Sequence, residues 1–320
     1  MKLTQIGYKA NRAPFIRDTV TTRGTMRDII FVLLFPLAMA VYYYGTRVLF
    51  TAVVTSAVTY LLDIIFASII RKTVDPWDFS PIVTSLILTL LLPANVSVWL
   101  VIFGSFFAIA VAKYPFGGLG NNLFNPAAAA MAMLTVGYSS KIFLYPQPLA
   151  SDMSVVGQSI SGVLKYGGRP SVAAMELFVG NFRGPAGATC VLLILACLVF
   201  LIARKSVSIQ IPLSLIATVA VIAFLFPRTH TTRIESVMYE LCSGYLLFAA
   251  VFMFTDPVTA PKHNLAKIMY GVAGGALSMI FRYAGGYEQA VCFAILLSNA
   301  LSYSFDRIAI RIKEMERVKA

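Results

Sequence analysis

Long apolar runs recur along this chain, and they constrain its fold more than any other feature. A helix needs about 20 apolar residues to cross a hydrocarbon layer of roughly 30 Å. Hydrophobic residues occupy 58% of the 320 positions, and charged residues occupy only 12%. The pattern predicts an all-α integral membrane protein with about ten transmembrane helices, at 29–44, 48–70, 81–92, 96–112, 127–138, 188–203, 209–226, 239–254, 266–281 and 290–303.

A long polar segment separates the first five runs from the last five. Loops of almost fifty residues usually carry function or some structure of their own. Apolar residues from Met153 to Leu164 recur at helical spacing, which predicts a short amphipathic helix in this segment. The predicted regions are a cytoplasmic basic tail at 1–28, a first membrane half at 29–138, an extracytoplasmic loop at 139–187, a second membrane half at 188–303 and a cytoplasmic tail at 304–320.

The two membrane halves resemble each other. Lys113-Tyr114 follows the fourth run, and Arg282-Tyr283 follows the ninth. Because each half holds five runs, an odd number, the second half must cross the membrane in the opposite direction to the first. We therefore expect two inverted five-helix repeats, a design that places ligand sites near broken helices at the interface between the halves.

The net charge of +12 follows the membrane pattern. Basic residues lie mostly in the tails and in short loops, where the positive-inside rule places them on the cytoplasmic face. This distribution argues against nucleic acid as a partner and predicts that both termini are cytoplasmic. The first 28 residues show no apolar signal-peptide core. The four cysteines lack metal-ligand spacing, so we assign no metal site.

A glycine-rich approach to the sixth run carries a threonine of interest. We expect the helix to begin near Ala188, with Thr189 in its first turn and Gly187 leaving space before the hydroxyl. The first N–H groups of a helix lack intrahelical partners and attract anions, and Arg183 would also favour a bound phosphate. Thr189 is therefore a candidate phosphoester anchor for a flavin nucleotide. A helix start that only needs small residues would show the same pattern.

Two polar breaks are candidates for a second ligand site. The first is the glycine turn that ends in Asn121, Asn122 and Asn125, and the second is the Asp-Pro break at Asp256. The predicted topology places both at the cytoplasmic side. Asparagine amides and a carboxylate could bind the edge of an isoalloxazine ring, whereas turn and helix-cap chemistry would also explain them.

One carboxylate lies inside an apolar run. Asp63 falls within the second run, where an ionisable group is a candidate for function by default. It could belong to an ion path, as could Asp256. Alternatively, it could pair with Arg71 or Lys72 near the cytoplasmic end of the same run.

Three segments together resemble the D subunit of the Rnf complex and its paralogue, the B subunit of the sodium-pumping NADH:quinone reductase. Residues 117–127 read Gly-Gly-Leu-Gly-Asn-Asn-Leu-Phe-Asn-Pro-Ala, residues 254–261 read Phe-Thr-Asp-Pro-Val-Thr-Ala-Pro, and residues 184–190 read Gly-Pro-Ala-Gly-Ala-Thr-Cys. The last segment is similar to the family's flavin-attachment segment, but it has Ala188 where Glu is common and Cys190 where Ser is common. The resemblance covers essentially the whole membrane region.

The resemblance implies an electron-transfer subunit of a complex that couples ferredoxin:NAD⁺ electron transfer to Na⁺ or H⁺ translocation in a bacterial or archaeal cell membrane. It implies FMN joined through its phosphate to Thr189 and a non-covalent riboflavin. Other subunits of the complex would carry the iron–sulfur clusters and the nicotinamide site, so this chain would not be catalytically complete alone. The paralogue usually has a longer N-terminal extension, which favours the Rnf type here.

Three other functions fit parts of the pattern. The chain could be the B subunit of the sodium-pumping NADH:quinone reductase, or a solute channel with the same inverted repeat and no redox role. A purely structural membrane subunit is a weaker third possibility. A bare channel does not need the Gly-Ala-Thr approach to the sixth run or the long outer loop, and covalent flavin would distinguish the electron-transfer subunit from a channel. A structural subunit would not explain the glycine–asparagine and Asp-Pro motifs on the same side.

Overall fold

Helices account for every apolar run predicted from the sequence. The computed structural model describes residues 21–70, 77–150, 152–228 and 232–319. The N-terminal half contains α1 (Thr22–Tyr44), α2 (Thr46–Ile69), α3 (Ser80–Leu91), α4 (Val98–Phe106), the π-helical turn η1 (Phe107–Lys113), the 3-10 turn η2 (Tyr114–Phe116) and α5 (Pro126–Ile142).

The polar segment and the C-terminal half follow. The segment holds two paired two-residue strands and two short helices, and the second half holds six helices. These elements are β1 (Tyr145–Pro146), β2 (Val156–Gly157), α6 (Ile160–Lys165), α7 (Ala174–Val179), α8 (Val191–Ala203), α9 (Gln210–Leu225), α10 (Arg233–Cys242), α11 (Leu246–Phe252), α12 (Asn264–Ala284) and α13 (Val291–Lys319).

Among the described residues, four helices are long and apolar enough to cross a membrane. These are α1, α2, α12 and α4 with its continuation to Phe116, and the bent pair α10–α11 would make a fifth. The expectation of an all-α membrane protein is therefore confirmed. Helices α3, α8 and α9 are apolar but shorter than a plain crossing.

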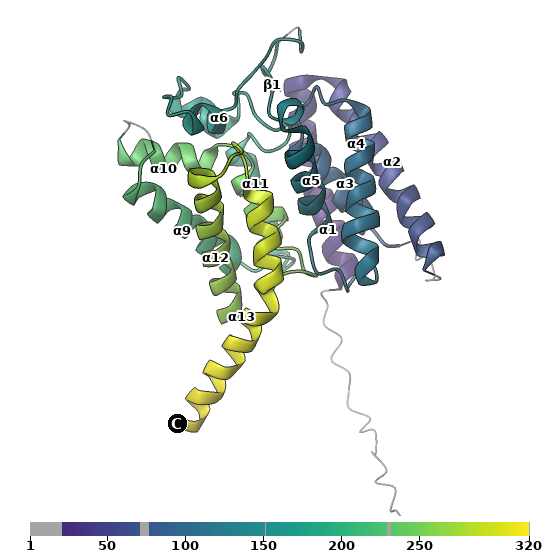
Figure 1. The fold of residues 1–320 in the computed structure, drawn as a ribbon, viewed down its shortest axis with the longest axis vertical. Helices are drawn as coiled ribbons and strands as arrows, with labels where there is room; N and C mark the ends of the chain where they lie inside the picture. The colour runs from purple at the N-terminus through teal and green to yellow at the C-terminus, as the bar shows by residue number, and fades with distance from the viewer. Residues whose placement is uncertain (1–20, 71–76, 151, 229–231, 320) are drawn as a thin grey trace, which may run out of the picture.

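The helices form two bundles. Helices α1 to α5 lie together on one side, and α9 to α13 lie on the other (Figure 1). Contacts between α5 and α13 join the two bundles, and α8 lies between them, in contact with α1 and with α11. The start of α1 and the end of α13 lie at one end of the molecule, whereas β1 and α6 lie at the opposite end (Figure 1). The two termini of the described chain therefore share one face.

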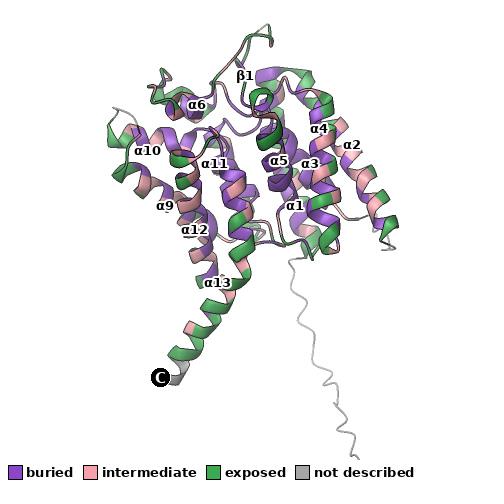
Figure 2. Cartoon of the chain, in the orientation of Figure 1, coloured by how far each residue is buried: buried purple, intermediate pink, exposed green. Residues whose placement is uncertain are grey.

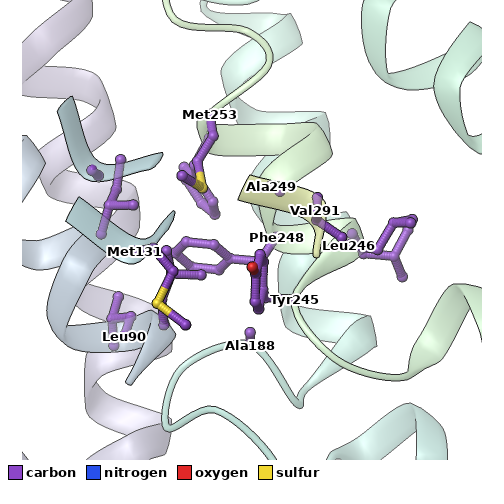
Figure 3. Packing of buried hydrophobic residues seen from close by; sticks show 14 of the residues in the cluster. Leu90, Met131, Ala188, Tyr245, Leu246, Phe248, Ala249, Met253 and Val291 are labelled. Carbon is purple, nitrogen blue, oxygen red and sulfur yellow. The ribbon is translucent and has the colours of Figure 1, made fainter. Parts of the chain in front are cut away.

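The core lies where the two bundles meet. All seven residues of α11 are buried, and so are eleven of the twelve residues of α3; Figure 2 shows the burial concentrated on these inner helices. Leu90 of α3, Met131 of α5 and Phe248 of α11 gather there beside Ala188 (Figure 3). Two short helices that are buried on nearly all sides need such a surround.

Three expectations about element boundaries are corrected. The predicted span at 239–254 is two helices, α10 and α11, bent by 54° at a break around Gly244, whose φ of 70° favours glycine. The amphipathic helix expected from Met153 forms only at Ile160–Lys165, because residues 156–157 pair with β1 instead. The last run, expected to end at Tyr303, continues as one helix through the charged tail to Lys319.

Candidate functional site

The segment around Thr189 is docked on the end of α3. The backbone N–H of Ala186 donates to Leu92 O at 3.0 Å, and that of Gly187 donates to Leu90 O at 2.9 Å. The last carbonyls of a helix lack intrahelical partners, so these two hydrogen bonds complete α3. They also hold residues 186 and 187 outside any helix.

Helix α8 therefore begins later than expected. It starts at Val191 with Cys190 as its N-cap, so the prediction that Thr189 occupies the first helical turn is wrong. Thr189 lies immediately before the cap and is 1% exposed. Among the described residues its hydroxyl has no hydrogen-bond partner, and the first-turn N–H groups of α8 lie next to it in the chain.

Gly187 does not leave space before the Thr189 hydroxyl as the sequence predicted. Gly187 makes room for Leu90 and not for the Thr189 hydroxyl, because a Cβ at Gly187 would lie 2.7 Å from Leu90 Cβ. Gly184 is the residue that faces Thr189, since a Cβ there would lie 2.8 Å from Thr189 Cγ2. Gly180, at φ 97°, packs its backbone against the peptide that joins Thr189 to Cys190.

Arg183 is not placed beside Thr189 by any contact of the described chain. Its guanidinium lies against Gly157 of β2, and it lines a cavity of about 320 Å³ together with Asn181 and Glu176. Its Nε is buried without a hydrogen-bond partner among the described residues. The guanidinium therefore faces the structured polar segment.

Three of the four residues predicted to form a second ligand site lie together. Asn122, Asn125 and Asp256 line one cavity between the two bundles. Asn125 Nδ2 donates to Asp256 Oδ2 at 3.4 Å, which joins the glycine turn of the first half to the Asp-Pro break of the second. Asn121 is separate from this cavity: it is exposed, and its side chain lies against Gly117.

Asn125 and Asp256 also have local structural roles. Asn125 Oδ1 accepts from Ala128 N at 3.1 Å and so caps α5, with Pro126 in the first helical position. Asp256 Oδ1 accepts from Val258 N at 3.2 Å and closes its own turn. Their functional and capping roles can coexist, because different atoms of Asn125 serve each one.

The cavity itself is small. Its volume is about 40 Å³, and it is lined by apolar residues of α1, α3 and α11 as well as the polar group. Sites for drug-sized ligands usually measure about 300–1,000 Å³. The amide and carboxylate groups suit the hydrogen-bonding edge of a flat ring, but the volume does not admit one unless the two bundles separate.

Sequence reasoning missed a buried cation at this cavity. Lys113, which directly follows the fourth apolar run, ends the π-helical turn η1 and is 3% exposed. Its Nζ pairs with Asp63 Oδ1 at 2.7 Å and Asp78 Oδ2 at 3.2 Å, and it also donates to Ser80 Oγ at 2.8 Å. Lys113 thus ties α2 to the start of α3.

Asp63 has a partner that the sequence analysis did not name. Among the described residues its partner is Lys113, and the alternatives Arg71 and Lys72 lie outside them. A buried charge of one sign requires a partner of the other. The signal in the sequence was the presence of Asp63 in one apolar run and of Lys113 at the end of another.

A second buried cation cluster lies in the C-terminal half. Arg282 near the end of α12 is buried and pairs with Glu240 of α10 at 3.0 Å, and its Nη2 donates to Ser243 O at 2.9 Å. Arg228 also pairs with Glu240, at 2.7 Å. Lys113 and Arg282 therefore each tie an acidic group to the start of a short buried helix, α3 or α11.

Comparison with known proteins finds similar chains of nearly the same length. The D subunit of the proton-translocating ferredoxin:NAD⁺ oxidoreductase complex of Clostridium ljungdahlii is 28% identical, over 96% of this chain and 96% of that protein. The D subunit of the Na⁺-translocating ferredoxin:NAD⁺ oxidoreductase complex of Acetobacterium woodii is 28% identical over 95% of this chain and 94% of that protein. The D subunit of the ion-translocating oxidoreductase complex of Stutzerimonas stutzeri is 30% identical over 72% of this chain and 74% of that protein.

The family match covers both membrane halves and the polar segment between them. The signature of the family described as NQR2, RnfD, RnfE matches residues 9–313. This range includes Thr189, the Asn125–Asp256 pair and both buried cation clusters. The chain belongs to the NQR2, RnfD, RnfE family.

Proposed function

We propose that this chain is the membrane electron-transfer subunit of an Rnf-type complex, which couples ferredoxin:NAD⁺ electron transfer to Na⁺ or H⁺ translocation. The observation that carries the proposal is near full-length similarity to the D subunits of two such complexes. The partners would be the other membrane, iron–sulfur and flavin subunits, within a bacterial or archaeal cell membrane. The chain would be one part of a translocase and would not be complete alone.

We further propose that Thr189 carries FMN through its phosphate. The absence of a hydrogen-bond partner for the hydroxyl among the described residues supports this, as does the adjacent start of α8, where unpaired N–H groups favour a phosphate. Because the side chain is 1% exposed, attachment would require the 184–190 segment to open away from α3. Gly184, Gly187 and Ala188 leave this segment with little side-chain bulk to move.

A second, non-covalent flavin such as riboflavin would bind between the bundles. The grouping of Asn122, Asn125 and Asp256 supports this site, with Lys113 as a nearby cation. The 40 Å³ volume means that binding would have to widen the contact between α5 and the 253–258 turn. Asn121, which is exposed at the same turn, would not take part.

The topology we propose has ten spans in two inverted five-helix repeats, with both termini cytoplasmic. Three features support it: the matched clusters at Lys113 and Arg282, the short buried helices α3 and α11, and the shared face of the two ends. Short helices that end inside the membrane are found in transporters built on such repeats. The polar segment at 145–179 would then be extracytoplasmic.

Covalent flavin tests this function directly. In Thr189→Val, fluorescence of the denatured protein band is expected to vanish, because valine keeps the shape of the side chain and lacks only the hydroxyl. Thr189→Ser retains a hydroxyl and is the matched control, so its band should stay fluorescent. The mass of the peptide that contains residue 189 should exceed the unmodified mass by that of the esterified FMN.

Two results would contradict the proposal. A fluorescent Thr189→Val band would place the flavin on another residue. A wild-type protein without covalent flavin, isolated from a cell that makes the rest of the complex, would favour the solute-channel alternative. The B subunit of a sodium-pumping NADH:quinone reductase would be indicated instead if electrons passed to quinone and not between ferredoxin and NAD⁺.

A further inference from the structure

A buried carboxyl group lies at the end of the molecule opposite the Asp256 cavity. Glu288 belongs to the loop between α12 and α13 and is 8% exposed. This loop packs against the start of α6, which lies at the end of the molecule away from the C-terminus (Figure 1). The flavin proposals do not involve it.

Glu288 has hydrogen bonds but no ion pair among the described residues. Its Oε1 accepts from Ser159 Oγ at 2.9 Å and from Gln289 Nε2 at 3.5 Å, while Oε2 packs against Gly162. Lys165, the nearest cation, donates to the backbone carbonyl of Gly286 instead. Buried carboxylates elsewhere in the described chain, such as Asp63 and Glu240, are held by a lysine or arginine.

An unsatisfied acceptor lies next to this carboxyl group. Gln289 is 0% exposed; its Nε2 donates to Tyr145 OH at 3.2 Å, but its Oε1 has no partner among the described residues. Leaving a buried acceptor unpaired costs about 1–3 kcal/mol. This oxygen lies near Gly244 and the Arg282 guanidinium, whereas the amide group turns its Nε2 toward the carboxylate.

The site is open to the aqueous face. A cavity of about 350 Å³ is lined by Glu288 and by Gln158, Ser139 and Ser140. Lys165 and Tyr166 line its side. A small cation can therefore reach the carboxyl group from the polar segment without crossing the apolar core.

We propose that Glu288 binds the translocated monovalent cation, Na⁺ or H⁺, at the end of the ion path opposite the Asp256 cavity. The inference rests on the proposed function. The carboxylate would provide the negative charge, and Ser159 would hold the carboxyl group in place.

The raised pKa of the Glu288 carboxyl group supports the proposal. Burial raises the pKa of Glu288 to about 7, against the opposing effects of the hydrogen bonds from Ser159 and Gln289, the charge of Lys165 and the hydroxyl of Tyr145. The group is therefore half protonated near neutral pH and can exchange a proton or a sodium ion there. It lies in a loop between helices, at the polar end of the molecule.

The test is Glu288→Gln in the intact complex reconstituted in vesicles, with ferredoxin and NAD⁺ supplied. Ion uptake per electron transferred should be lost, whereas flavin content and subunit assembly should match wild type. Asp152→Asn is the control, since it removes an exposed carboxylate of the same polar segment. It should transport ions normally.

The vesicle experiment gives different results for H⁺ and for Na⁺. If the ion is H⁺, loss of uptake is measured by a pH-sensitive dye and does not depend on added Na⁺. If the ion is Na⁺, Glu288→Asp should retain ²²Na⁺ uptake but need a higher Na⁺ concentration for half-maximal rate. If Glu288→Gln fails to assemble, the pH dependence of ion uptake by Glu288→Asp tests the inference instead. A cation-binding carboxyl group in a changed position must shift that pH dependence.

Wild-type ion uptake and an unchanged pH profile in Glu288→Gln would overturn the inference. An unshifted pH profile and Na⁺ dependence in Glu288→Asp would overturn it equally. Failure of the proposed function looks different: wild type, Asp152→Asn and Glu288→Gln would then all lack ferredoxin-dependent ion uptake. The two failures are thus separable in one set of vesicles.

Discussion

At the scale of single residues, two buried cations hold the short helices α3 and α11 in place. Lys113 binds Asp63 and Asp78, and Arg282 binds Glu240. Removing one partner of such a pair leaves an uncompensated buried charge, which typically costs about 3–5 kcal/mol. These residues therefore fix the positions of α3 and α11, between which the Asn125–Asp256 cavity lies.

The residues of that cavity provide the first prediction. Asn125→Leu or Asp256→Leu should lower acid-extractable riboflavin and leave the covalent flavin band unchanged, because each removes a polar group from the cavity and neither is near Thr189. Asn121→Leu is the matched control from the same turn, since Asn121 lies outside the cavity. Flavin is measured by fluorescence after acid extraction.

Full riboflavin content in both cavity variants would place the second flavin elsewhere. Asn125 also caps α5, and loss of a cap costs about 0.5–2 kcal/mol. Subunit assembly should therefore be measured alongside, so that loss of flavin is compared among variants that assemble equally.

At the scale of elements, the docking of the 184–190 segment on α3 is the contact that positions Thr189. Two backbone hydrogen bonds and the lack of a side chain at Gly187 make it possible. The contact is local in space but joins residues almost a hundred positions apart in sequence. It couples the proposed attachment site to the innermost helix of the first half.

The second prediction concerns this contact. Gly187→Ala should lower the stability of the solubilised protein by about 1–3 kcal/mol, because its Cβ would lie 2.7 Å from Leu90 Cβ and 2.8 Å from Leu90 Cγ. The midpoint of thermal unfolding and the yield of covalent flavin should both fall. Gly137→Ala in α5 meets no atom within 4 Å and is the control.

An unchanged unfolding midpoint in Gly187→Ala would show that the segment is not held against α3 in solution. Gly137→Ala should be neutral or slightly stabilising, because alanine is favoured over glycine within a helix by about 1 kcal/mol.

At the scale of the whole molecule, both ends of the described chain lie on one face. Asp28 near the start of α1 pairs with Arg204 after α8, and Asp306 of α13 accepts from the N–H groups of Lys262 and His263 before α12. These contacts bring the start of α1, the α8–α9 turn and the approach to α12 to the same end. The polar segment is at the other end (Figure 1).

The third prediction is that this shared face is cytoplasmic. Green fluorescent protein fused to either terminus should be fluorescent, and alkaline phosphatase fused there should be inactive. Phosphatase inserted at the exposed residue Ser154 should be active. Active phosphatase at either terminus would reverse the orientation and move Thr189 to the cytoplasmic side.

The sequence by itself determined where the helices are. Each of the ten apolar runs is helical, although the run at 239–254 is divided between α10 and α11. The hydrophobic effect and the need to satisfy backbone hydrogen bonds in lipid leave an apolar run few other structures. Short motifs also marked Asn122, Asn125 and Asp256, since turns and helix caps depend on neighbouring residues. The family could be predicted because its three motifs are local strings.

Only the tertiary structure decided how distant residues meet. The exact start of α8 depends on hydrogen bonds to Leu90 and Leu92, and no local signal at residues 186–190 encodes an acceptor so far away in sequence. The partners of Lys113 and the enclosure of Glu288 depend in the same way on which helices pack together. Charge in a sequence looks the same in a loop and in a buried pair, because burial is a property of the packed chain.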